Sequence, residues 1–107
     1  MKILLDECVT KRLKGLLVDF NVSTVSENKW NGLRNGHLMK TAIENGFDVL
    51  ITIDKNLIFQ QNIKKADIII VVFDSPTSNI ADVGLFIPEF LIQIGTFTKG
   101  NAYLLNR

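Results

Sequence analysis

Three aspartates in this chain each end a short apolar run. Asp6, Asp54 and Asp74 close the runs at residues 2–6, 48–54 and 67–74. Each run is rich in branched apolar residues and lacks proline and glycine, which is typical of a strand buried on both faces of a parallel sheet. In such sheets, ligands bind outside the carboxyl ends of the strands. The pattern therefore predicts an acidic pocket that attracts a divalent cation.

Clustered carboxylates repel one another unless a cation lies between them. Magnesium and manganese suit such a cluster, because hard cations take oxygen ligands. We predict Asp6, Asp54 and Asp74 as metal ligands, and Asp6, Glu7 and Asp54 as catalytic residues, with Glu7 a base or an additional ligand. Such a site can activate water and polarise a phosphodiester. The alternative is that Asp54 and Asp74 only cap the segments that follow them.

A polar stretch follows the second aspartate. Lys55, Asn56, Gln60, Gln61 and Asn62 place many hydrogen-bond donors just beyond Asp54. They could hold the phosphate backbone of a nucleic acid, or they could form the solvated face of a helix. The sequence leaves both interpretations open.

Three further side chains could take part in chemistry or binding, but we predict structural roles for them. Cys8 is the single cysteine and has no histidine near it in the sequence, so we predict a buried structural thiol. His37, the single histidine, is expected at the surface in the first turn of a helix. Trp30 lies in a polar segment and is expected to anchor a loop, with base stacking as the alternative.

The size and composition indicate one cytoplasmic domain. The chain has 107 residues, 47% hydrophobic residues and a formal net charge of +1. This balance gives no overall attraction to nucleic acid, so any such binding needs a local patch. A lone cysteine fits a reducing compartment. No apolar run approaches the roughly 20 residues that span a bilayer, and the absence of an apolar leader predicts no signal peptide.

Strands and helices are expected to alternate, which predicts an α/β fold with a doubly wound, mostly parallel sheet. If the strand near residue 21 lies on one side of the first strand and the 48–54 strand on the other, Asp6 and Asp54 face each other across the switch point. Pro88 predicts a break near Phe86 in the last helix. The expected strands are 2–6, 21–25, 48–54, 67–74 and 102–105, the last at an edge, and the expected helices are 10–18, 35–45, 55–63 and 80–94.

Several motifs together resemble a known family. They are the LLDE motif that ends at Glu7, the segment at residues 30–36, the TIDKNL motif within residues 47–57 and the QQN motif at residues 60–62. The chain up to about Phe73 resembles the short bacterial PIN-like proteins, which are related to the PIN-domain ribonucleases of toxin–antitoxin systems.

The resemblance implies a three-layer α/β sandwich that cuts single-stranded RNA with magnesium or manganese held by three or four acids. Asp6 matches the first acid, and Asp54 matches the acid at the end of the later strand. The acid on the intervening helix falls near Asn35, which is expected to contact substrate instead, with Glu44 as a possible substitute. Asp74 aligns with the last acid.

The leading expectation is therefore a Mg- or Mn-dependent ribonuclease, the toxin half of a two-gene module with an antitoxin protein as its partner. The alternative is a PIN-like domain without efficient catalysis that binds RNA or protein, which the amide at Asn35 favours. A homodimer is compatible with either, and neither implies a membrane. A phosphoacceptor domain of the receiver type is disfavoured, because it needs a lysine and a helix where residues 101–107 offer neither.

Overall fold

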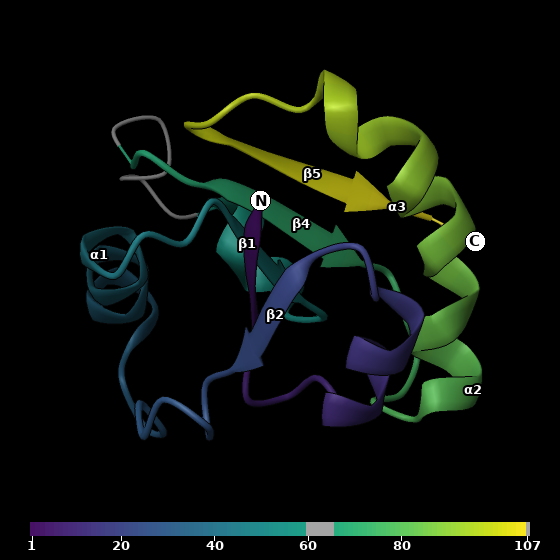
Figure 1. Cartoon of the computed structure of the whole chain (residues 1–107), viewed down its shortest axis with the longest axis horizontal. Coiled ribbons are helices and arrows are strands. Elements are labelled where there is room, and N and C mark those ends of the chain that lie inside the picture. The colour runs from purple at the N-terminus through teal and green to yellow at the C-terminus, as the bar shows by residue number, and fades with distance from the viewer. Residues whose placement is uncertain (60–65, 107) are drawn as a thin grey trace.

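Five parallel strands form a single sheet in the computed structural model, which describes residues 1–59 and 66–106. The predicted substrate-binding residues Gln60 and Gln61 lie outside the described residues. The strand order is β2-β1-β3-β4-β5 (Figure 1). Every neighbouring pair is parallel, so the predicted sheet, with the last strand at an edge, is confirmed. The strands are β1 (Lys2–Leu5), β2 (Asn21–Thr24), β3 (Val49–Thr52), β4 (Ile69–Phe73) and β5 (Asn101–Leu105).

Helical segments cover both faces of the sheet and make the fold a three-layer α/β structure (Figure 1). One face packs against α1 and η2, and the other packs against η1, α2 and α3. The bounds are η1 (Lys11–Leu16), α1 (Asn35–Glu44), η2 (Lys55–Phe59), α2 (Ile80–Val83), η4 (Gly84–Phe86), α3 (Ile87–Gln93) and η5 (Ile94–Thr96). No helix in residues 1–59 and 66–106 is long and apolar enough to span a membrane.

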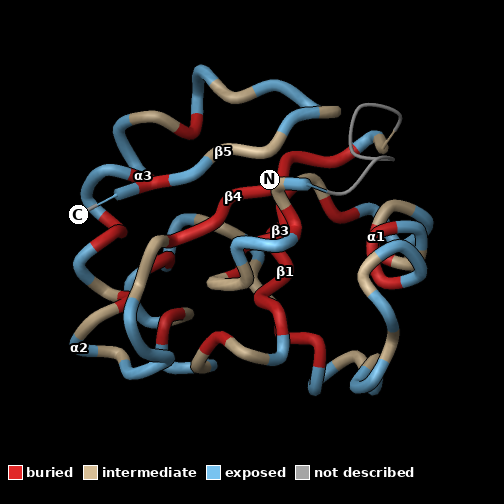
Figure 2. The backbone as a smooth tube through the Cα atoms, turned by 180° about the vertical axis from the view of Figure 1, so that it is seen from behind, coloured by how far each residue is buried: buried red, intermediate tan, exposed pale blue. Residues whose placement is uncertain are grey.

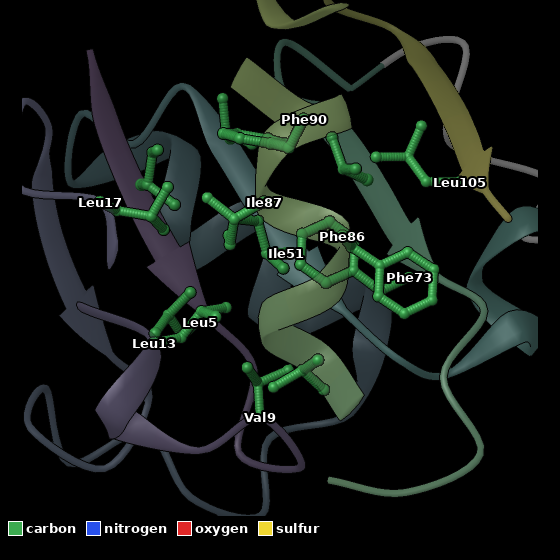
Figure 3. Packing of buried hydrophobic residues seen from close by; sticks show 14 of the residues in the cluster. Leu5, Val9, Leu13, Leu17, Ile51, Phe73, Phe86, Ile87, Phe90 and Leu105 are labelled. Atoms are coloured by element: carbon green, nitrogen blue, oxygen red, sulfur yellow. The ribbon is translucent and has the colours of Figure 1, made fainter. Parts of the chain in front are cut away.

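The central strands are buried on both sides, as their continuous apolar runs predict (Figure 2). Successive side chains point to opposite faces, so Leu5 and Ile51 belong to one core cluster while Leu4 and Leu50 belong to the other. On the first face, the Phe73 ring stacks on Phe86 at a centroid distance of 5.1 Å (Figure 3). Two separate cores thus hold the strand ends in place.

The break predicted in the last helix is confirmed. After α2, the 3-10 turn η4 ends at Phe86, and α3 begins at Ile87 with Pro88 in its first turn. Proline is tolerated in a first helical turn because the backbone N–H it lacks has no partner there. The end predicted for the second helix also holds, since Gly46 adopts a φ of +82° directly after Asn45.

Two local predictions for the helices are wrong: that residues 10–18 form an α-helix with Leu16 on its apolar face, and that Asn35 caps the next helix. The segment after Thr10 is a 3-10 helix that ends at Leu16, and it leaves Leu16 47% exposed. The tighter 3-10 winding moves side chains off the face that an α-helical spacing gives. Asn35 does not cap α1, because it is the first helical residue and Arg34 occupies the capping position without a side-chain hydrogen bond.

Asp48 ties the amino-terminal edge of the sheet together. Its carboxylate accepts a hydrogen bond from the Lys2 backbone N–H at 2.8 Å and pairs with Lys99 at 3.2 Å. The Lys2 N–H, together with the Lys99 ammonium, holds the pKa of Asp48 below its ordinary value of 3.8. The ionised form is therefore the one that stabilises the fold.

We expect Asp48→Ala to lower the free energy of unfolding by about 1–2 kcal/mol, because the Lys2 N–H and the Lys99 ammonium lose their acceptor in a half-exposed setting. A depressed pKa gives stability that is fully present above the unfolded-state value and lost as the pH falls through the folded-state value. The loss in Asp48→Ala should therefore be full at pH 7 and should shrink below about pH 4. Urea melts at pH 7 and pH 3 measure this, and an equal loss at both values would contradict it.

Candidate functional site

A hollow of about 300 Å³ lies at the carboxyl ends of β1 and β3. β1 has β2 on one side and β3 on the other, so this is the point where the strand order reverses. Ligands of doubly wound sheets bind at such a point. The lining residues are Asp6, Glu7, Cys8, Leu33, Asn35, Ile53 and Asp54. The predicted facing of Asp6 and Asp54 across the switch point is thus supported by a shared hollow.

Asp6 is the buried carboxylate of the site, with 7% of its surface exposed. Its Oδ1 accepts a hydrogen bond from the Glu7 backbone N–H at 2.9 Å, and its Oδ2 accepts one from the Thr52 hydroxyl at 2.7 Å. An ionised carboxylate has about four acceptor positions on its two oxygens. Asp6 is therefore fixed by its neighbours and still has oxygen lone pairs for a ligand.

Thr52 connects the two acids and was not singled out from the sequence. It is fully buried at the end of β3, and its single hydroxyl proton goes to Asp6. The same oxygen accepts the Asp54 backbone N–H at 3.0 Å. The signal was available, since Thr52 is the one polar residue in the apolar run at residues 49–53, and a buried hydroxyl needs a partner.

Asp54 is half-buried and serves two purposes. Its Oδ1 accepts a hydrogen bond from the Asn56 backbone N–H at 3.0 Å, so Asp54 caps the start of η2. Capping is the alternative role that the sequence suggests for Asp54. It also lines the hollow with Asp6. Capping occupies one acceptor position of the carboxylate, so the two interpretations are compatible.

Glu7 and Cys8 complete the wall that follows β1. Glu7 is exposed, and its Oε2 accepts hydrogen bonds from the Asn31 side chain and the Gly32 N–H, both at 3.3 Å. Cys8 is half-buried, with its sulfur 3.5 Å from the Thr52 hydroxyl and 3.7 Å from Asp6 Oδ2. Burial raises the pKa of the Cys8 thiol, and the Asp6 carboxylate acts in the same direction. The protonated thiol is a poor nucleophile.

Helix α1 presents Asn35 to the hollow at its first residue. This is the position where the resemblance places a further acid. Glu44 ends the same helix and lines a different hollow, with His37 and Lys40, so it does not replace the missing carboxylate there. His37 is exposed, and Trp30 is half-buried with its ring edge against Phe47, as predicted.

Asp74 does not join the other two aspartates among the residues that line the hollow. Its Oδ1 lies 2.5 Å from the Lys55 ammonium, and this ion pair links the end of β4 to the start of η2. Asn56, which is also predicted to bind substrate, follows Lys55 in the sequence and is exposed. Of the three predicted metal ligands, the structure brings together Asp6 and Asp54.

The donor set of the hollow fits a hard cation bound by few protein ligands. Within residues 1–59 and 66–106, no group of three or more His, Cys, Asp or Glu side chains is arranged to hold a metal ion. In the same part of the chain, no lysine or arginine forms an ion pair with Asp6 or Asp54. Magnesium is commonly bound through one or two carboxylates while it keeps several waters. Asp6 and Asp54 can serve such an ion, with the amide oxygen of Asn35 beside them.

We expect Thr52→Val to lower the free energy of unfolding by about 1–3 kcal/mol, since Asp6 loses a buried donor and the half-buried Asp54 N–H loses its acceptor. Thr52→Ser keeps the hydroxyl and removes one methyl group, so it should restore both bonds at a cost of about 1 kcal/mol. Urea melts of both variants measure the difference. Equal stability of the valine and serine variants would show that the hydroxyl does not hold the two acids.

Comparisons of the chain with protein-family models, with curated proteins and with solved structures gave no significant match.

Proposed function

We propose that this protein is a small Mg- or Mn-dependent ribonuclease of the PIN-like type that cuts single-stranded RNA. The observation that carries the proposal is the shared hollow at the strand switch point. Asp6, Asp54 and Asn35 line it together, and they come from the ends of two neighbouring strands and the start of a helix. These are three of the four positions that the resemblance aligns with acids of the nuclease site; the fourth, Asp74, does not line the hollow.

The metal, when bound, would supply an activated water and charge stabilisation at the phosphate. Asp6 and Asp54 would hold it through carboxylate lone pairs that their protein hydrogen bonds leave available. Thr52 would keep Asp6 oriented by its 2.7 Å hydrogen bond and would fix the backbone at Asp54. Because no histidine, lysine or arginine among residues 1–59 and 66–106 lines the hollow, the carboxylates are the charged groups in this part of the chain that could act on the substrate there.

In this proposal, Lys55 binds the substrate next to the hollow. Lys55 follows Asp54 directly and carries the positive charge closest to it in the sequence. Its side chain is 58% exposed, so a phosphate can reach it. The proposal includes the toxin role and an antitoxin protein as the partner, both of which rest on the family resemblance.

Purified protein should cleave single-stranded RNA slowly in the presence of manganese, because Asn35 leaves the site one carboxylate short. EDTA should abolish the activity, and added manganese should restore it. A gel assay with labelled RNA and with duplex RNA as the comparison substrate measures this. Cleavage that persists in EDTA would exclude the proposed mechanism.

One observation favours a second candidate, a PIN-like domain that binds RNA or protein without cutting. Asn35 places an amide where a third acid is expected, and two carboxylates hold magnesium less firmly than three or four. This candidate predicts salt-dependent RNA binding in EDTA and no cleavage with any divalent metal. The cleavage assay above separates it from the nuclease.

The strand order favours a third candidate less strongly. The order β2-β1-β3-β4-β5 is a common doubly wound order that phosphoacceptor receiver domains share, and those domains also place acids after the first and third strands. The lysine that such a domain needs at the end of its last strand is replaced here by Leu105 and Asn106. Incubation with acetyl phosphate and magnesium should leave the protein mass unchanged. A stable phosphoryl adduct on Asp54 would favour this candidate over the nuclease.

A further inference from the structure

The ion pair between Lys55 and Asp74 joins two neighbouring strand ends beside the hollow. The Lys55 Nζ lies 2.5 Å from Asp74 Oδ1, and the two side chains are 58% and 34% exposed. Lys55 comes directly after the hollow residue Asp54, and Asp74 comes directly after β4, the next strand in the sheet. The pair therefore fixes a cation at the edge where the two acids meet.

Backbone contacts hold both ends of this pair in place. The Asp54 carboxylate caps the turn that begins η2, which sets the position of Lys55. The Asp74 N–H donates to the Leu105 carbonyl at 2.9 Å, which anchors Asp74 to β5. A free lysine side chain samples many rotamers, and ordering it costs conformational entropy. The ion pair with Asp74 favours one position of the Lys55 ammonium before any ligand arrives.

We propose that Asp74 is a positioning residue for Lys55 and not a ligand of the metal, and that the positioned Lys55 ammonium binds a phosphate of the RNA backbone next to the hollow. The inference rests on the proposed function. Asp74 already has a cation as its partner and does not line the hollow, whereas Asp6 and Asp54 do. An ammonium group has three donors, so Lys55 can keep its bond to Asp74 while it donates to a phosphate oxygen.

The test compares the native protein with Asp74→Asn, Lys55→Met and the double variant, with Asp67→Asn as the matched control. Asp67 is exposed and comes before β4, at the opposite end of the strand that Asp74 follows. Manganese affinity is measured by calorimetry, binding of a single-stranded RNA by fluorescence anisotropy in EDTA over a series of salt concentrations, and cleavage in manganese. Melting curves show that each variant is folded.

We expect Asp74→Asn to bind manganese within about twofold of the native protein. Lys55→Met should weaken RNA binding and reduce the slope of log affinity against log salt by about 0.7, the value for one phosphate contact on a single strand. Asp74→Asn should leave that slope nearly unchanged, because Lys55 keeps its charge, and should lower kcat/KM by no more than Lys55→Met does. The double variant should cleave no more slowly than Lys55→Met, because Asp74 acts through Lys55.

A tenfold loss of manganese affinity in Asp74→Asn would make Asp74 a ligand and overturn the inference. An additive loss in the double variant would also overturn it. Native protein that binds manganese but no RNA would remove the phosphate role of Lys55 and leave the metal site standing. RNA binding that depends on both residues, without any manganese binding, would uphold the ion-pair inference and remove the proposed nuclease.

Discussion

Asp54→Asn is expected to weaken manganese binding on the order of 100-fold and to abolish RNA cleavage, because it removes one of the two aspartates of the hollow that are proposed to hold the metal. The fold should survive the change. The amide oxygen of asparagine can still accept the Asn56 N–H that Asp54 Oδ1 accepts now, so the cap on η2 is kept. Calorimetric titration with manganese and the RNA gel assay measure the two effects.

Asp67→Asn serves as the control for charge, since it removes the same charge from an exposed position at the amino end of β4. It should bind manganese as the native protein does. Asp6→Asn should also lose the metal, and it should stay folded. Because asparagine offers a single acceptor oxygen to the Thr52 and Glu7 donors, we expect a stability cost of about 1 kcal/mol without metal. Unchanged manganese affinity in both Asp54→Asn and Asp6→Asn would remove the metal site.

Asn35→Asp is expected to raise manganese affinity about tenfold, equal to about 1.4 kcal/mol, and to speed RNA cleavage. The change adds a third aspartate to the hollow, where Asn35 already lines the wall with Asp6 and Asp54. Repulsion between the added carboxylate and those already present lowers stability without metal. The new charge also sits at the first residue of α1, where the helix dipole favours it. The stability of the metal-free protein should therefore change little, while the rise in melting temperature on adding manganese should grow.

Asn21→Asp is the matched control, because it adds the same charge at the exposed start of β2, at the opposite edge of the sheet. It should leave the manganese-induced rise in melting temperature as it is in the native protein. If Asn35→Asp gains no affinity over this control, position 35 does not face the metal. The hollow would then match the nuclease pattern at two positions only.

Local patterns in the sequence predict the layers of this fold and the edge of the sheet at which the hollow lies. Continuous apolar runs predicted the central strands, Pro88 predicted the break before α3, and the acids that end the runs at Asp6 and Asp54 predicted the edge where the hollow lies. These features can be predicted from short stretches of sequence. A strand buried on both faces needs a continuous apolar run, and proline breaks a helix wherever it occurs in the interior.

Which partner each polar side chain has follows from the tertiary structure and not from the local sequence. Three aspartates end equivalent strands, but Asp74 pairs with Lys55 while Asp6 receives the hydroxyl of Thr52 from a strand that is distant in the sequence. The depth and partners of a side chain depend on the register and neighbours of its strand, which a local pattern does not contain. The helical form of the segment ending at Leu16 likewise depends on how it packs against the sheet, because packing outweighs the weak intrinsic preferences of so short a helix.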